Sequence, residues 1–324
     1  MGALWVVAEP GPEHGLAKIS TEIATLTREL GASTGMEVVG VVIAAEPAEP
    51  AAELARYVPR VLAIQDADAG VLAWSAIAAV HLAALAEADV PDLVLVGSGP
   101  DGRDVAGALS ALTGLGVLTN ATGVAWAGDG PIVEMSVFGG KLQTSSVFAG
   151  GRGIMTVRPS VTTAVPAGTA GTVAARTVSA SPLPPVRVVD RVSEAGVAAP
   201  IEEAKIIVAG GRGVGGPAGF DIVEQLAEAL GGAVGATRAA VDSGWIPYSQ
   251  QIGQTGKIVK PELYLALGIS GAIQHKVGMQ TAGTIVAVNR DPDAPIADFA
   301  DLLVVGDLFE VGSALLEQLR GRSG

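Results

Sequence analysis

The stretch "LYLALGISGAIQHKVGM", residues 263–279, decides how the second half of the chain folds. Its apolar beginning predicts a buried strand, and the small residues that follow predict a tight turn into a helix. A strand that ends in such a turn can hold a pyrophosphate with the N–H groups of Ser270 and Gly271 and with the helix dipole. Gln274 and His275 fall about one turn further along, close to whatever the phosphates lead to.

The composition limits the kind of protein this is. With 324 residues, 49% of them hydrophobic, the chain can form two domains with sizeable cores. It has no cysteine, which excludes disulfides, thiolate nucleophiles and cysteine-bound metals, and with three histidines we expect no metal site. A net charge of −13 without a basic cluster disfavours nucleic acid as a partner. Since neither a membrane-spanning apolar run nor a signal peptide is visible, we expect a cytoplasmic protein that is not an integral membrane protein.

The first half of the chain alternates short apolar runs with Ala-rich segments of helical period, which predicts βαβ units in a mainly parallel sheet. The predicted strands cover 4–7, 38–43, 61–64 and 93–96, and the predicted helices cover 18–30, 71–87 and 104–112. After Gly114, β-branched runs broken by glycine and proline predict β-hairpins, with a turn in "AGDGPI" at 127–132.

The segment 179–204 holds four prolines and no long periodic pattern, so we place the connection between two α/β domains there. We expect an N-terminal domain at 1–190, with a mainly parallel sheet, flanking helices and hairpins, a linker at 191–204, and a doubly wound, Rossmann-like domain at 205–324. In the second domain the expected strands begin at Ile206, Ala233, Leu263, Thr284 and Leu302, and the expected helices cover 220–230, 271 onward and 308–319.

Two further segments of the second domain combine glycine with polar groups at strand ends. In "AGGRGVGGPAGF", Gly211, Gly213 and Gly216 match the dinucleotide pattern G-x-G-x-x-G, but glycine is so frequent here that the match is weak. Near the end of the next strand, where a dinucleotide-binding fold usually has an acid, this chain has Arg238. Two interpretations of the glycine loop therefore stay open: an NADP-dependent dehydrogenase, or a tight turn that binds no ligand. In "IGQTGK", Gln254 and Thr255 suit a heteroaromatic ring, or form an ordinary polar loop.

The stretch 263–289 resembles the signature of the electron transfer flavoprotein α subunit. The neighbouring "GGRGV", "TRAAVDSG", "GQTGK", "NRDPDAPI" and "GDLF" follow that family's order and spacing, and they cover nearly all of 205–324. The first half is similar more loosely, through "GRDVAGALSALTG" and "TVRPSVT". The resemblance implies a heterodimer with a β subunit, one FAD in the C-terminal domain, and AMP or a second FAD in the β subunit.

The same resemblance implies an electron carrier without an organic substrate of its own. Such a carrier takes electrons one at a time from flavoprotein dehydrogenases of the acyl-CoA dehydrogenase type, in fatty acid oxidation, and passes them to a membrane quinone oxidoreductase. A chain without metal or thiol needs an organic cofactor for this chemistry. A purely structural adaptor with empty glycine loops is the third interpretation. In the N-terminal domain, which in this family packs on the β subunit, "GSGPDGRD" resembles a phosphate cradle but is expected to be only a retained turn.

The resemblance also assigns roles to residues. Arg212 is implied to lie over the flavin ring and Thr255 to donate to N5, while His275 reaches the O2 edge as an imidazolium or as a neutral hydrogen-bond donor. His275 and Arg212 would then set the flavin potentials. The implied cofactor-binding residues are Arg212, Thr237 (where the family commonly has serine) and Arg238 near the ring; Ile252, Gly253, Gln254 and Thr255 around it; Ser270, Gly271, Ala272, Ile273, Gln274 and His275 from the phosphates to the ring; and Asn289, Asp307 and Leu308 at the adenosine end.

Overall fold

The computed structural model describes residues 2–11, 15–128, 130–137, 142–179, 186–189, 201–202 and 204–322. The chain divides into two compact units, Met1–Val192 (unit 1) and Ser193–Gly324 (unit 2). Most of the expected linker 191–204 lies outside the described residues, so the boundaries of the linker stay a prediction.

The described residues of unit 1 form a nine-stranded sheet in the order β7-β6-β5-β8-β4-β1-β2-β3-β9. All neighbouring strands are parallel except β5–β6 and β6–β7, which form antiparallel hairpins at one edge. The strands are β1 (Ala3–Val7), β2 (Glu37–Ala44), β3 (Arg60–Gln65), β4 (Leu93–Gly97), β5 (Gly116–Ala127), β6 (Gly130–Val137), β7 (Leu142–Val147), β8 (Gly153–Val157) and β9 (Thr172–Ala175). The predicted mainly parallel sheet with hairpins is confirmed.

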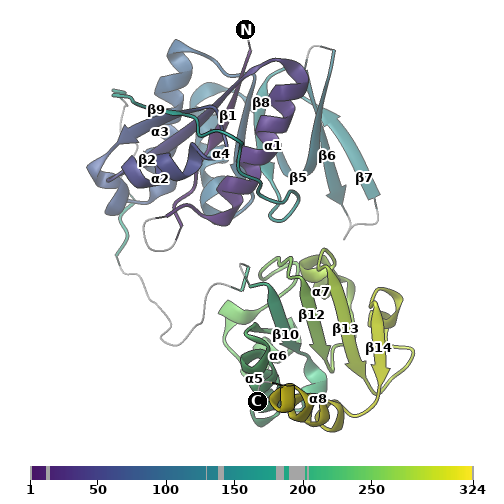
Figure 1. Cartoon of the computed structure of the whole chain (residues 1–324). Coiled ribbons are helices and arrows are strands. Elements are labelled where there is room, and N and C mark those ends of the chain that lie inside the picture. Colours follow the sequence, from purple (N-terminus) through teal and green to yellow (C-terminus); the bar gives the residue numbers. More distant parts are fainter. Residues whose placement is uncertain are drawn as a thin grey trace. The chain divides into compact units, whose positions relative to one another are not determined.

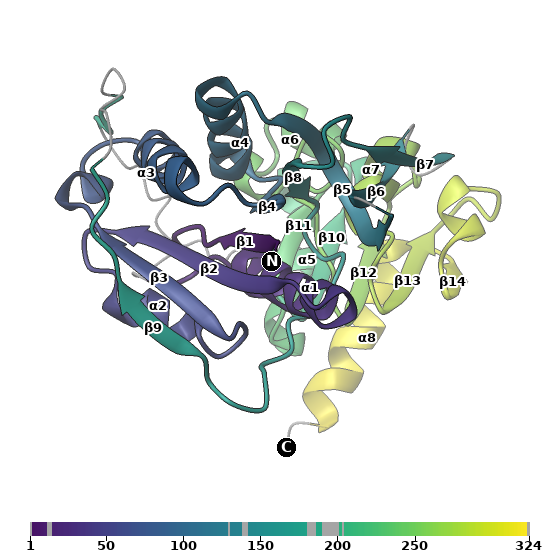
Figure 2. The ribbon, with the colours of Figure 1, turned by 90° about the horizontal axis from the view of Figure 1, so that it is seen from above.

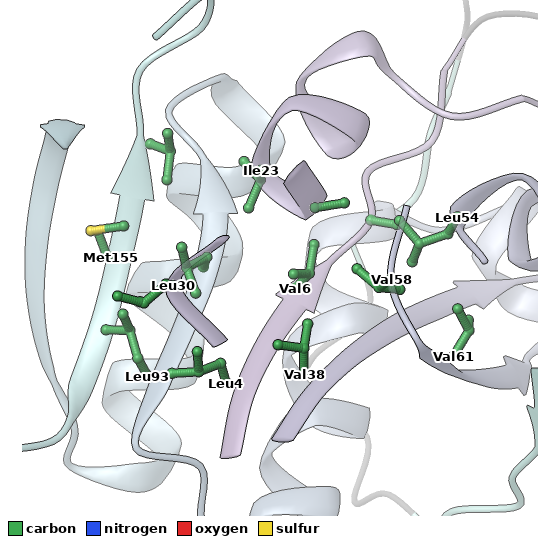
Figure 3. Packing of buried hydrophobic residues seen from close by; sticks show 14 of the residues in the cluster. Leu4, Val6, Ile23, Leu30, Val38, Leu54, Val58, Val61, Leu93 and Met155 are labelled. Carbon is green, nitrogen blue, oxygen red and sulfur yellow. The ribbon is translucent and has the colours of Figure 1, made fainter. Parts of the chain in front are cut away.

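Helices cover both faces of this sheet: α1 (Lys18–Thr34), α2 (Ala48–Leu54), α3 (Trp74–Ala88) and α4 (Pro100–Thr113). Because successive side chains of a strand point to opposite faces, Leu4 and Val6 of β1 pack toward α1 and α2, whereas Trp5 and Val7 pack toward α3 and α4. Figure 2 shows α3 and α4 on one side of this sheet and α1 on the other, and Figure 3 shows the side chains of the core beneath α1. A sheet covered on both faces needs the continuous apolar strands seen in the sequence.

Unit 2 has a five-stranded, fully parallel sheet in the order β11-β10-β12-β13-β14 (Figure 1). The strands are β10 (Ile206–Gly210), β11 (Ala233–Ala236), β12 (Leu263–Leu267), β13 (Thr284–Asn289) and β14 (Leu302–Val305); the helices are α5 (Phe220–Leu230), α6 (Arg238–Asp242), α7 (Ile273–Met279) and α8 (Leu308–Arg322). Helices α5 and α8 pack on one face, and α7 packs on the other. The predicted doubly wound α/β fold is confirmed.

Each sheet has a point at which the strand order reverses, and ligands of open α/β proteins bind at the carboxyl ends of the strands there. In unit 2 this switch point lies between β10 and β12, and in unit 1 it lies between β1 and β4. Helix α2 was missed from the sequence because Pro47 and Pro50 suggest a loop. Pro50 lies in the first turn of the helix, where its missing N–H costs no intrahelical hydrogen bond.

No helix in the described parts of the chain is long and apolar enough to cross a membrane.

Candidate functional site

The glycine-rich turn after β10 closes against the end of β12. The Gly211 N–H donates to the Leu267 carbonyl (2.9 Å), and the Gly213 N–H donates to the Gly268 carbonyl (2.9 Å). A Cβ on Gly213 would lie 2.7 Å from the Cα of Gly268, so only glycine allows this approach. Both N–H groups are thus used within the protein, which favours the tight-turn interpretation. The geometry gives no support to the NADP-dependent dehydrogenase that would use this loop.

The turn after β12 has the opposite character. Gly271 has φ +85°, and a Cβ there would lie 2.4 Å from the backbone nitrogen of Ile296, which donates to the Ser270 carbonyl (3.0 Å). The N–H groups of Ser270, Gly271 and Ala272 donate to no described residue. Helix α7 has only seven residues, so the turn, rather than a helix dipole, offers the donors at this edge of the sheet. The predicted phosphate contact stays a prediction.

The loop Ile252–Thr255 is fastened to the sheet and to α7. The Ile252 N–H donates to the Ala236 carbonyl (2.9 Å), and the Gln254 N–H donates to the Gln274 carbonyl (2.7 Å). Gly253 has φ +142°, and a Cβ there would lie 2.8 Å from the Gln274 carbonyl oxygen. The structure therefore brings together two of the segments that the sequence singled out, and the side chains of Gln254, Thr255 and Gln274 remain exposed.

Thr255 is held by two residues that the sequence analysis did not assign to the site. The buried Gln251 donates from its Nε2 to Thr255 Oγ1 (3.1 Å), and Tyr248 donates from its hydroxyl to the Thr255 carbonyl (2.6 Å). Since the Thr255 oxygen already accepts a hydrogen bond, its hydroxyl proton is left to be donated outward. The repeated glutamines of "SQQIGQTG" were the only signal that could have indicated this support.

His275 lies in the core instead of at the surface. Its Nε2 and the Tyr264 hydroxyl are 2.9 Å apart, and its Nδ1 and the Ile252 carbonyl oxygen are 3.1 Å apart. A carbonyl only accepts, so Nδ1 carries the proton and Nε2 accepts from Tyr264. Burial lowers the pKa of His275 from 6.5 to about 4, although the Ile252 carbonyl partly opposes this shift.

With its pKa lowered to about 4, the imidazole is expected to be neutral at pH 7, which favours the neutral hydrogen-bond donor of the two protonation states that the sequence left open. Both ring nitrogens are used within the protein. A contact with the O2 edge of a flavin would require one of these hydrogen bonds to break, so this predicted contact stays a prediction. In the described arrangement His275 connects α7, β12 and the loop at Ile252.

The two arginines of the candidate site differ in their surroundings. Arg212 is exposed in the short 3-10 turn Arg212–Val214 and forms no ion pair with a described residue. Arg238 begins α6 and pairs with Asp242 one turn later (3.1 Å). Of these two arginines, Arg212 is thus the one without an ion-pair partner among the described residues.

Two buried polar atoms near the ends of β10 and β11 lack partners among the described residues. They are the Thr237 hydroxyl, between β11 and α6, and Oε1 of Gln250, which precedes the loop at Ile252. A buried polar atom without a hydrogen bond costs about 1–3 kcal/mol, so a ligand with polar groups would relieve this cost. With the free N–H groups at 270–272, these atoms fit a flavin dinucleotide, although the sequence analysis did not name Gln250.

The residues expected at the adenosine end already have structural roles. Asn289 donates from Nδ2 to the Ile269 carbonyl (3.0 Å) and accepts from the Asp291 N–H (3.0 Å), which ties β13 to the turn after β12. Asp307 caps α8, because its Oδ1 accepts from the Phe309 N–H (2.7 Å). Its hydrogen bond with Arg290, more than the backbone N–H groups, lowers the pKa of Asp307.

The side chain of Leu308 is buried in the core beside α5. The adenosine contacts of these residues stay predictions. In the described parts of the chain, no group of three or more histidines and acids is arranged to hold a metal ion.

Comparison with known proteins adds to this geometry. Residues 200–280 match the electron transfer flavoprotein FAD-binding domain, and residues 4–183 match the electron transfer flavoprotein domain. An electron transfer flavoprotein subunit alpha from Mycobacterium leprae is 42% identical over 313 residues, which is 96% of each chain. The chain belongs to the electron transfer flavoprotein α-subunit family.

Other members of the electron transfer flavoprotein α-subunit family are also similar to the chain. The protein of that name from Mycobacterium tuberculosis (strain H37Rv) is 44% identical over 96% of each chain, and that from Bacillus subtilis is 37% identical over 88% of each chain. The family consists of electron carriers rather than classical enzymes, and the subunit name implies a β subunit as partner. The match to a FAD-binding domain supports flavin binding in unit 2.

Proposed function

We propose that this chain is the α subunit of a heterodimeric electron transfer flavoprotein and that unit 2 binds one FAD. The observation that carries this proposal is the set of polar groups without described partners near the carboxyl ends of β10, β11 and β12, in a segment that matches a FAD-binding domain. FAD supplies one-electron redox chemistry, which a chain without cysteine does not offer by itself. The rest of the work falls to binding, orientation and hydrogen bonding.

In this proposal the N–H groups of Ser270–Ala272 hold the pyrophosphate, and the loop 252–255 lies along the ring. Thr255 donates its hydroxyl proton to N5, because Gln251 occupies its acceptor side. Arg212 supplies positive charge, which favours the reduced, more negative forms of the flavin. His275 is neutral, so an attraction between two full charges, about 4 kcal/mol at ~4 Å and an effective dielectric of ~20, is not part of its contribution.

The partners follow from the family rather than from the geometry. We propose that the β subunit carries AMP or a second FAD, that flavoprotein dehydrogenases of the acyl-CoA dehydrogenase type are the donors, and that a membrane quinone oxidoreductase is the acceptor. The chain then acts as a carrier without a substrate of its own. Its cytoplasmic location stays a prediction.

Thr237→Val tests the proposal, because valine has the shape of threonine without the hydroxyl. If the Thr237 hydroxyl binds FAD, the variant should bind FAD about tenfold more weakly, as expected for one lost hydrogen bond of about 1.4 kcal/mol. Without FAD it should be at least as stable as the wild type, since an unpaired buried hydroxyl has been removed. Thr172→Val, on the exposed strand β9 of unit 1, is the matched control.

The measurements are flavin absorbance, FAD per α subunit, and FAD affinity of the chain co-expressed with its β subunit. One FAD bound per α subunit supports the proposal. A complex that stays colourless when FAD is offered contradicts it, and binding of NADPH instead would favour the dehydrogenase. Equal FAD affinity of Thr237→Val and wild type would remove Thr237 from the site.

A further inference from the structure

The switch point of unit 1 contains a buried carboxyl group. Glu9 lies two residues after the end of β1, beside "GSGPDGRD" (97–104), the turn between β4 and α4 that resembles a phosphate cradle. Its exposed fraction is only 6%. The position is the one at which open α/β sheets hold their ligands, and it is independent of the FAD site proposed for unit 2.

The β4–α4 turn is shaped around this carboxyl group. The Gly97 N–H donates to Glu9 Oε1 (2.8 Å). A Cβ on Gly97 would lie 2.3 Å from Glu9 Oε1, and a Cβ on Gly102 would lie 2.1 Å from the Gly97 carbonyl oxygen and 2.5 Å from Glu9 Oε1. Gly97 thus leaves space for the Glu9 side chain, and Gly102 leaves space for both the Gly97 carbonyl and Glu9.

The backbone of Glu9 is also fixed. Its N–H donates to Ser20 Oγ (2.9 Å), and its carbonyl accepts from the Ala17 N–H (3.0 Å), so α1 holds it from the other side. Helix α4 begins after Gly99, which has no side chain to cap the helix. A negative group at this end of a helix is favourable. Asp101 provides one in the first turn of α4, and Glu9 adds a second carboxyl group from a different element.

Stability alone does not explain an acid at this position. Burial raises the pKa of Glu9 from 4.5 to about 7; the Gly97 hydrogen bond partly opposes this shift, and the nearby Asp101 adds to it. Keeping the carboxyl group ionised in this place therefore costs folding free energy. An amide of the same shape would avoid that cost.

We propose that Glu9 is a built-in ligand whose carboxyl group takes the place of a phosphate group at the switch point of unit 1. Unit 1 thus retains the framework of a phosphate-binding site, and the Glu9 side chain occupies the space that the phosphate would take. A phosphate-type anion is the ligand class that the framework would take if the side chain were removed.

Three forms of the full chain, each saturated with FAD, test this proposal by calorimetric titration with inorganic phosphate. Glu9→Ala removes the built-in ligand and should bind one additional phosphate at least about tenfold more tightly than wild type, as expected for an anion at a partly buried helix end. Glu9→Gln, which still fills the space, is the matched control and should bind no additional phosphate. Any phosphate bound in unit 2 is common to the three proteins.

The proposal is overturned if Glu9→Ala binds phosphate no better than Glu9→Gln, or if the wild type binds phosphate in unit 1 as tightly as Glu9→Ala. If Glu9→Ala does not fold, the Gly97 amide in the wild-type protein decides the matter by NMR. Its proton shift should move as Glu9 titrates, and this movement should be absent in Glu9→Gln. A Gly97 shift that is independent of pH in the wild type would show that the carboxyl group does not occupy the turn.

Discussion

Replacing Glu9 by glutamine should change the pH dependence of the stability of unit 1. The pKa of Glu9 is raised from 4.5 to about 7 in the folded protein, so between these values the folded state binds more protons than the unfolded state. The free energy of unfolding of the wild type therefore falls as pH rises through this window. At about 1.4 kcal/mol per pKa unit, the complete cost above pH 7 is about 3 kcal/mol.

The glutamine of Glu9→Gln does not ionise, so the free-energy cost of a buried charge is absent in this variant. Relative to the wild type, the variant should gain about 2–3 kcal/mol of stability between pH 5 and pH 8. A penalty of the glutamine variant that does not depend on pH, such as an unpaired side-chain amide N–H, cancels when the stability difference at pH 5 is subtracted from that at pH 8. The depressed pKa of His275 lowers stability as pH falls from 6.5 toward 4, but that histidine is in unit 2 and is the same in both proteins.

Urea unfolding of the FAD-saturated chain at several pH values measures the effect. Hydrogen exchange in β1 and β4 reports on unit 1 alone, which matters because two units need not unfold together. Glu46→Gln, at an exposed position in the same unit, controls for the general effect of one less negative charge. If the stability difference between Glu9→Gln and wild type were the same at pH 5 and pH 8, the assigned burial of the Glu9 charge would be wrong.

Two further predictions concern unit 2. Tyr264→Phe removes the donor to His275 Nε2 and should lower the free energy of unfolding by about 1–3 kcal/mol, as measured by urea unfolding; an unchanged value would show that the bond contributes nothing. Gly271→Ala should abolish FAD binding and lower the melting temperature more than Gly244→Ala. Both glycines have positive φ, but a Cβ at 271 meets backbone at 2.4 Å whereas one at 244 meets nothing within 4 Å, so equal effects would mean that the close contact is unimportant.

The strands could be predicted from the sequence because both sheets are covered on two faces. Continuous apolar runs such as Ile206–Gly210 and Leu263–Leu267 then end at glycines, and β10 and β12 begin where the pattern placed them. Helix α6 was missed because a helix of five residues has no detectable period. Strands β8 and β9 were not predicted either, although the short apolar run of β8 is of the kind that predicts a buried strand.

The site was less predictable, because its decisive contacts join distant segments. The sequence indicated that loops 252–255 and 270–275 belong to one site, but not that Tyr264 and the Ile252 carbonyl would enclose the His275 ring. The cap formed by Asp307 had a local signal, the D-x-x-E pattern at 307–310 before an apolar helix. Glu9 had none, since a single acid after a strand is equally typical of an exposed loop.

The two units make opposite use of the same topology. Both sheets reverse their order next to a glycine-rich turn. In unit 1 the Gly97 N–H and the space beside Gly102 are taken by Glu9, whereas in unit 2 the Thr237 hydroxyl and the N–H groups at 270–272 have no described partner. Polar groups left unpaired in a folded protein cost free energy unless a ligand compensates for them. Of these two turns, ligand binding is therefore expected at the one in unit 2, where polar groups lack a described partner, and not at the one in unit 1, where Glu9 accepts from the Gly97 N–H.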